Sequence, residues 1–232
     1  MLNLEGLKKL DLDSISLRVS GCRDLHYIQG DIGDWLENDD MINKNTRDIK
    51  IEILGSSLEN DESIRIGEMR GYFFESELAR DDISFLYLCD AMSADLEMMA
   101  SAIINEHGNI REEFCDCHET LMYIDRIYLE EKYRGLGISS YVIENLNEIL
   151  EFSINLYPRV VLILLPMPQD RIEEGLLSEM KNEEKKHLCK QKLVKLYKNL
   201  GFNEIENTDY MLKKVEDPFL INLKNWTASK IN

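Results

Sequence analysis

The chain has 232 residues, five cysteines and a formal net charge of −17 at neutral pH. This length suits one α/β domain, and an odd number of irregularly spaced cysteines excludes a disulfide framework. Because a strong excess of carboxylates repels phosphate backbones and anionic lipids, we expect neither a nucleic acid nor a membrane as a partner.

The sequence also shows no targeting or membrane segment. Charged residues interrupt every apolar run in residues 1–20, so no signal peptide is visible. The longest apolar run covers residues 160–165, which is far too short to cross a bilayer. We therefore expect a soluble, cytoplasmic protein.

The N-terminal half favours strands. Residues 14–19 are typical of a first strand, and residues 49–54 alternate isoleucines with charged side chains in the period-two pattern of a half-buried strand. Residues 64–74 have the same character, and the polar stretch 55–63 lies between the two. We therefore predict an antiparallel hairpin over 49–54 and 64–74.

The apolar period changes over residues 85–104. Apolar residues recur there every three or four positions, from Phe85 to Ile103, which predicts one amphipathic helix. Ser84 is a suitable N-cap, and Gly108 lies just past the end.

The C-terminal half alternates strands with helices, which predicts an α/β sheet with crossover helices. We treat residues 46–232 as one domain, and residues 1–45 as an N-terminal extension of undefined structure. The predicted elements are strands 120–129 and 159–165, helices 135–151 and 188–200, and a closing hairpin of 202–206 and 210–215.

The stretch Arg134-Gly135-Leu136-Gly137-Ile138-Ser139 follows a predicted strand and opens a predicted helix. Glycines permit a tight turn and a close approach of a ligand to the backbone. The first turn of a helix has unpaired N–H groups and the positive end of the helix dipole, so it attracts anions. The arginine adds a permanent positive charge, and together these features predict a pyrophosphate ligand.

The spacing of the glycines excludes two common classes of pyrophosphate-binding loop. No Gly-Lys-Ser or Gly-Lys-Thr follows, as a P-loop requires, and the three-glycine frame of a dinucleotide fold is absent. By itself, a glycine-containing turn between a strand and a helix is common in α/β proteins.

The surrounding sequence resembles the acetyl-CoA-binding segment of the GNAT N-acetyltransferases. In IYLEEKYRGLGISSYVIENL, Arg134 and Gly137 match the family pattern, whereas Ser139 stands where glycine or alanine is usual. Downstream, KLYKNLGF at 195–202 is similar to the end of a family helix. The resemblance covers about 119–215, and it implies a GNAT-like α/β (α+β) fold. Such a fold has a mixed, mostly antiparallel sheet flanked by helices and splayed between its two core parallel strands.

The resemblance also implies a set of acetyl-CoA contacts. The backbone of Ile127 and Leu129 would bind the pantetheine arm, and Arg134 would lie beside the phosphates. The N–H groups of the loop would hold the pyrophosphate, and they belong to Gly135, Leu136, Gly137, Ile138 and Ser139. Acetyl-CoA is the expected co-substrate, and no metal is expected.

By the same resemblance, the reaction is direct attack of an amine on the thioester, which needs a base and an acid. Tyr197 matches the tyrosine that often protonates the departing thiolate. Asp125 and Glu119 are candidate bases, and a solvated carboxylate is the alternative for each. By strand alternation, Asp125 would share a face with Tyr123 and Ile127.

Several alternatives stay open. The chain could be a non-catalytic acyl-CoA-binding or regulatory module on the same fold, or an interaction protein whose glycine turn is a coincidence. Cys115-Asp116-Cys117-His118 has the residue types of a zinc site but not the usual spacing, so reduced cysteines are the default. The long connection 167–186 is a candidate cover for the acceptor site. The partner is expected to be a small-molecule or peptide amine, and a homodimer is one of the oligomeric states left open.

Overall fold

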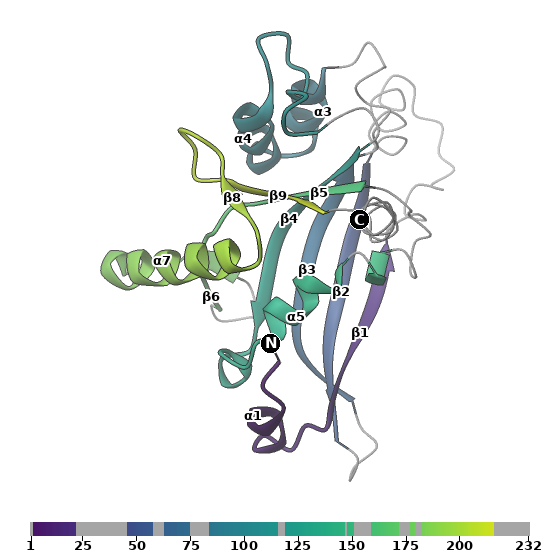
Figure 1. The fold of residues 1–232 in the computed structure, drawn as a ribbon, viewed down its shortest axis with the longest axis vertical. Coiled ribbons are helices and arrows are strands. Elements are labelled where there is room, and N and C mark those ends of the chain that lie inside the picture. The colour runs from purple at the N-terminus through teal and green to yellow at the C-terminus, as the bar shows by residue number, and fades with distance from the viewer. Residues whose placement is uncertain are drawn as a thin grey trace, which may run out of the picture.

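The computed structural model describes residues 2–21, 46–57, 63–74, 84–115, 119–146, 148–150, 159–171, 177–179 and 182–215. Figure 1 shows the long strands side by side, with α3 and α4 at one end and α1 at the other. The elements are α1 (Leu4–Lys8), β1 (Ser14–Gly21), β2 (Thr46–Ser56), β3 (Ser63–Phe74), α3 (Phe85–Met92), α4 (Ala94–Ile103), β4 (Glu119–Leu129), the 3₁₀ turn η2 (Glu131–Tyr133), α5 (Ile138–Glu144), β5 (Arg159–Leu164), β6 (Gln169–Arg171), β7 (Leu177–Glu179), α7 (Glu183–Asn199), β8 (Asn203–Glu204) and β9 (Met211–Val215).

One seven-stranded sheet organises these elements, in the order β1-β2-β3-β4-β5-β9-β8. Neighbouring strands are antiparallel except for β4 and β5, which are parallel. The predicted fold class is confirmed: the sheet is mixed and mostly antiparallel, with helices on its faces. The predicted hairpin is β2 and β3.

The N-terminal extension predicted over residues 1–45 contributes to this sheet. Its strand β1 pairs with β2 along all eight of its residues, from Ser14 opposite Ser56 to Gly21 opposite Ile49. Part of the extension is therefore an edge strand of the domain. Residues 22–45 lie outside the described residues, and the boundary at residue 45 stays a prediction.

The sheet separates two hydrophobic cores because strand side chains alternate between its faces. On β4, Met122 and Ile124 belong to the core that includes α5 and α7, whereas Leu121 and Tyr123 belong to the core under α3 and α4. The second core is fixed in part by Phe74, whose ring meets Phe85 edge to face.

The helix predicted over residues 85–104 is in fact two helices. Ser93 has the extended conformation (φ −168°, ψ 155°), and its hydroxyl accepts a hydrogen bond from the Leu96 N–H at 3.3 Å. A serine side chain competes well for free N–H groups, so it starts a new helix here instead of continuing the first. The predicted cap Ser84 makes no capping bond and donates instead to the Gly108 carbonyl.

The parallel strands separate part of the way along, as the family resemblance implied. Pairing of β4 with β5 runs from Glu119 opposite Arg159 to Ile124 opposite Leu164 and then stops, although β4 continues to Leu129. Two prolines follow β5, at positions 166 and 168. Proline has no N–H to donate to a neighbouring strand, so the sequence itself ends the ladder at this point.

Among the described residues, none of the helices combines the length and the apolar character needed to span a membrane.

Candidate functional site

A cavity of about 640 Å³ lies in the gap where β4 and β5 separate. Its walls come from four parts of the chain: the second half of β4, the segment after β5, the glycine loop, and one face of α7. A volume of this size is typical of a site for a small molecule or cofactor. Pairing ends at residues 124 and 164, so side chains rather than a ladder line the gap.

The glycine loop forms one end of the cavity. Gly135 (φ +77°) and Gly137 (φ +79°) both have the left-handed conformation, which glycine adopts without strain. A Cβ on Gly135 would meet no atom within 4 Å, so the space above its backbone is open. Within the described part of the chain, the N–H groups of residues 137–140 find no acceptor. The start of α5 therefore presents free donors beside the cavity.

Arg134 is held in place at the cavity wall. Its Nε donates to the Leu129 carbonyl at 2.8 Å, and its guanidinium lies 5.4 Å from the centre of the Tyr128 ring. These contacts occupy one donor and one face of the group, and the remaining N–H donors are left for a ligand. Lys192 of α7 adds a further cation to the lining, which also includes Arg126.

The structure sorts the predicted cofactor contacts into two groups. Ile127, Leu129, Arg134, Gly135 and Ser139 line the cavity. The other three, Leu136, Gly137 and Ile138, are not part of its lining.

Those three residues hold the loop in place instead. The Leu136 carbonyl accepts from the Asn3 N–H at 2.9 Å, and the side chain of Leu136 packs against Gly6 of α1. Ile138 is buried in the core, and Gly137 supplies the left-handed turn at the start of α5. The N-terminal segment with α1 therefore contacts the loop through Leu136, which does not line the cavity.

Tyr197 lies on the wall of the cavity contributed by α7, and it is 9% exposed. Its ring packs edge to face against Phe202, with the ring centres 5.7 Å apart. Burial raises the pKa of its phenol to about 12. The hydroxyl is therefore protonated, and can donate, throughout the physiological range.

Asp125 lines the cavity because of a bulge in β4. Arg70 pairs with Arg126 and Gly71 pairs with Ile124, so Asp125 is an extra residue without a partner on β3. A bulge re-aims a side chain. Gly71 permits this one, since a Cβ there would come 2.5 Å from the carbonyl oxygen of residue 123.

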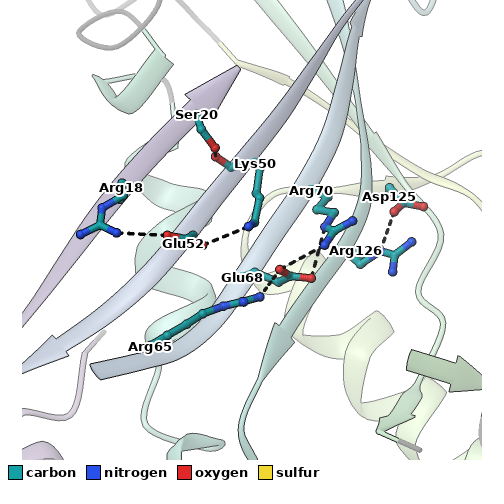
Figure 2. A network of polar contacts seen from close by, with 9 residues as sticks. All are labelled: Arg18, Ser20, Lys50, Glu52, Arg65, Glu68, Arg70, Asp125 and Arg126. Atoms are coloured by element: carbon teal, nitrogen blue, oxygen red, sulfur yellow. Dashed lines mark hydrogen bonds and ion pairs between the residues drawn. The ribbon is translucent and has the colours of Figure 1, made fainter. Parts of the chain in front are cut away.

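The bulge corrects one sequence-based expectation. Tyr123 and Ile127 were predicted to share a face with Asp125, but they contact opposite cores. The extra residue inverts the alternation after residue 124. The Asp125 carboxylate accepts from Arg126 Nε at 2.7 Å (Figure 2). Both residues line the cavity.

Glu119 is not brought to the cavity. It lies at the other end of β4, about 20 Å from Asp125 at the rise of an extended strand. The side chain is buried, and its Oε2 accepts from Lys214 Nζ at 3.1 Å. This geometry joins β4 to β9, so the two candidate bases have different surroundings.

Sequence analysis missed several residues of the lining. Arg126 follows the candidate base directly, and its role depends on the bulge, which has no clear signal in the sequence. Cys189 and Lys192 lie on the same face of α7 as Leu193 and Leu196, four residues earlier in the chain, and line the cavity with them. Met167 and Pro168 belong to the connection 167–186, whose hairpin β6–β7 is described in part. The proposed role of that connection as a cover stays a prediction.

The cysteine–histidine cluster falls largely outside the described residues, which include Cys115 but not 116–118. Cys115 is buried, and its thiol lies 3.4 Å from the Glu119 carbonyl. Over the ranges that the structure describes, no three His, Cys, Asp or Glu side chains gather as metal ligands would.

No protein-family model and no curated protein sequence matches the chain. Among solved structures, it is similar to AtaTR bound with acetyl-CoA, at 12% identity over 91% of this chain and 99% of that chain, with a TM-score of 0.39. It is similar to the KacTA–DNA complex at 12% identity over 90% and 99%, with a TM-score of 0.37. It is also similar to AtaT complexed with acetyl-methionyl-tRNAfMet, at 14% identity over 91% and 99%, with a TM-score of 0.34.

These are GNAT-fold acetyltransferases, and the present chain has a GNAT-like fold. Its strand order, its separated parallel strands and its glycine loop are all consistent with that fold. At identities and TM-scores this low, the likeness carries no argument about the substrate.

The exclusion of nucleic acid as a partner was wrong. Two of the similar structures are nucleic-acid complexes, one with DNA and one with a tRNA, so proteins of this fold are not barred from such partners. The exclusion relied on the net charge of the whole chain. A ligand, however, responds to the local electrostatic potential where it binds, and this potential can be positive on an acidic protein.

Proposed function

We propose that the chain is an acetyl-CoA-dependent N-acetyltransferase that transfers an acetyl group to a primary amine. One observation carries this proposal: the cavity between the separated ends of β4 and β5, closed at one end by the glycine loop and flanked by Tyr197. A narrow gap between two strands fits an extended pantetheine arm. Beyond residue 124 the pairing of β4 with β5 has ended, so backbone groups of β4 that face the gap can bind its amides.

The residues at the two ends of the gap match the two ends of acetyl-CoA. At one end, Arg134, the open space above Gly135 and the free N–H groups that begin α5 suit a pyrophosphate. At the other end, Asp125 and Tyr197 line the same cavity and suit the thioester and the incoming amine. The co-substrate would thus lie along β4.

The transfer needs one bond made, one bond broken and one proton moved. The neutral amine attacks the thioester carbonyl, the N–C bond forms, and the C–S bond breaks. Asp125 accepts the proton that the amine loses, directly or through water, and passes it to solvent. Arg126 Nε donates to this carboxylate at 2.7 Å and so fixes its position at the cavity wall.

Tyr197 acts on the sulfur that leaves. Its pKa of about 12 exceeds that of an ordinary thiol, about 8.5, so complete proton transfer would be uphill by about 5 kcal/mol. We therefore assign Tyr197 as a hydrogen-bond donor to the developing thiolate rather than as an acid that gives up its proton. The thiolate takes its proton from solvent after release.

Calorimetric titration with acetyl-CoA, followed by a thiol-release assay with a panel of amines, tests the proposal. We expect binding by the wild-type chain and weaker binding by Arg134→Gln, which removes the cation at the loop. The control is Lys132→Gln, because Lys132 is a neighbouring exposed cation over the Tyr133 ring that does not line the cavity. Absence of acetyl-CoA binding by the wild-type chain would refute the proposal.

The second candidate is a non-catalytic acyl-CoA-binding module on the same fold. It predicts the same binding but no thiol release with any amine. The position of Asp125 favours the enzyme. The bulge directs its carboxylate into the cavity, where it can accept a proton from an amine, and binding of the pantetheine arm alone does not need a carboxylate.

A further inference from the structure

A polar strip crosses the sheet next to the cavity. It consists of the charged side chains of Figure 2, which come from β1, β2, β3 and β4. The strip contains Arg18, Lys50, Glu52, Arg65, Glu68, Arg70, Asp125 and Arg126. Its last two members line the cavity, so the strip leads from the edge of the sheet to the proposed reaction centre.

The strip is locally cationic in an acidic protein. Five cations share three carboxylates: Glu52 pairs with Arg18 and Lys50, Glu68 pairs with two arginines of β3, and Asp125 pairs with its neighbour. The whole chain, by contrast, has 44 acidic and 27 basic residues. Asp48 lies two residues from Lys50 on the same face of β2, opposite Tyr72, so the strip together with Asp48 has five cations and four carboxylates.

The register places three of the cations in direct opposition. Lys50 pairs with Arg70 across β2 and β3, and Arg70 pairs with Arg126 across β3 and β4. Like charges directly opposite each other destabilise a sheet. The neighbouring Glu52 and Glu68 compensate in part, but they leave the row itself uniformly positive. A row of this kind is better explained by an anionic ligand than by the stability of the sheet.

The cationic groups reach solvent, whereas one carboxylate that orients them does not. The side chains of Arg18, Arg65 and Arg70 are 68%, 51% and 48% exposed, and that of Glu68 is 8% exposed. A buried carboxylate thus fixes two guanidinium groups at the surface. Each guanidinium keeps further N–H donors in a planar fork. A group with two acceptor oxygens, such as a phosphate, can accept two hydrogen bonds from such a fork.

Two tyrosines flank the row on the same face. Tyr72 follows Arg70 by two residues on β3, and Tyr128 follows Arg126 by two residues on β4, so strand alternation puts them with the cations. Both rings are half-buried. Basic side chains interleaved with aromatic rings suit a nucleic acid, since the cations bind phosphates and the rings stack on bases. An acidic peptide would use the cations alone.

We propose that this strip binds the phosphodiester backbone of a nucleic acid. Four strands about 4.8 Å apart extend the strip over about 14 Å, a length along which a nucleic-acid strand presents several phosphates. An amine attached to the end of such a strand would enter the cavity at Asp125. That last placement rests on the proposed acetyltransferase function, whereas binding of the backbone does not.

Fluorescence anisotropy tests the proposal with three labelled probes: a short single-stranded RNA, a DNA of the same sequence and a polyglutamate peptide. The variant is Arg18→Gln/Lys50→Gln/Arg70→Gln, in which no changed residue lines the cavity. The matched control is Lys8→Gln/Lys9→Gln/Lys195→Gln, which removes the same charge from exposed positions on or beside α1 and on α7.

We expect the wild-type chain to bind a nucleic acid with a steep salt dependence. The strip variant should reduce the slope of log K against log salt by about 2, at about 0.7 per lost phosphate contact of a single strand. The control should leave the slope unchanged. Binding of RNA alone, of DNA alone or of both supports the proposal and identifies the class of nucleic acid.

Three results overturn the inference: no binding of either nucleic acid, an equal loss in both triple variants, or binding of polyglutamate alone. Thermal unfolding and acetyl-CoA titration of each variant report on folding. If the triple variant unfolds, Arg18→Gln/Lys50→Gln leaves the Glu68 pairs intact and should reduce the slope by about 1.4. Intact acetyl-CoA binding without nucleic-acid binding refutes this inference alone, whereas the reverse result refutes the proposed enzyme.

Discussion

Tyr197→Phe tests how the leaving thiolate is stabilised. The substitution removes one hydroxyl and keeps the ring, which is 9% exposed and packs edge to face against Phe202. We therefore expect the free energy of unfolding to change by less than about 1 kcal/mol. Acetyl-CoA should bind with unchanged affinity, because the proposed bond to sulfur forms as the C–S bond breaks.

The size of the kinetic effect follows from the pKa. A phenol held at about 12 by burial keeps its proton and donates a hydrogen bond to an anionic sulfur. A charge-assisted bond contributes about 1.5–3 kcal/mol, so kcat/KM should fall by about 10- to 150-fold. Loss of a true general acid would instead cost up to about 10⁴-fold.

The assay is thiol release with an amine identified from the panel, measured across pH for the wild type, Tyr197→Phe and the control Tyr87→Phe. Tyr87 is an exposed tyrosine on α3, and its variant should behave as the wild type. Unchanged kcat/KM in Tyr197→Phe would refute any role of the hydroxyl. A drop near 10⁴-fold, together with an alkaline limb that disappears in the variant, would refute the hydrogen-bond role and restore full proton transfer.

Gly135→Ala and Gly201→Ala place a methyl group on left-handed backbone at φ +77° and +87°, so each should lower stability by about 1–2 kcal/mol. Acetyl-CoA titration should show weaker binding for Gly135→Ala alone, because its methyl enters the open space of the cavity; equal affinities would contradict the placement of the pyrophosphate. Asp125→Asn should lower turnover by about 10²- to 10⁴-fold, whereas Glu119→Gln should lower the melting temperature, because it breaks the contact with a lysine of β9, and leave turnover intact. If Glu119→Gln instead lowered turnover in the thiol-release assay and Asp125→Asn did not, Glu119 would be the base and Asp125 would not. Burial raises the pKa of Tyr197 from its usual value near 10 to about 12, so its contribution to stability is complete below pH of about 10 and declines as pH rises toward 12. Burial also raises the pKa of Tyr72, Tyr123 and Tyr210, so these groups add to the alkaline loss of stability in both proteins. In urea unfolding at about pH 11, Tyr197→Phe should lose about 1.4 kcal/mol less than the wild type, and equal alkaline loss in both proteins would disprove the assignment.

Much of the fold was predictable, because it follows from local periodicity. Alternating isoleucines define β2, and a run of β-branched residues defines β5. The ends of some elements were predictable as well, because Gly201 follows the end of α7 and two prolines follow the last paired residue of β5. The single helix predicted over 85–104 was wrong because a serine that can cap a helix looks the same in sequence as one within a helix.

The candidate site was predictable in part. The glycine loop and Tyr197 carry signals that depend on neighbours in sequence, and both border the cavity. The surroundings of Asp125 and Glu119 were not predictable. Both are carboxylates on one strand, and their difference depends on a bulge opposite Gly71 and on a lysine of a distant strand.

The sequence by itself determined most of the strands and helices of the sheet, the turn at Gly135 and Gly137, and the point at which β5 ends. These depend on backbone freedom and on the period of apolar side chains, which neighbouring residues set. The tertiary structure alone decided which side chains meet. Strand register placed Lys50, Arg70 and Arg126 in one row of an acidic protein, because charges far apart in the chain become neighbours only when strands pair.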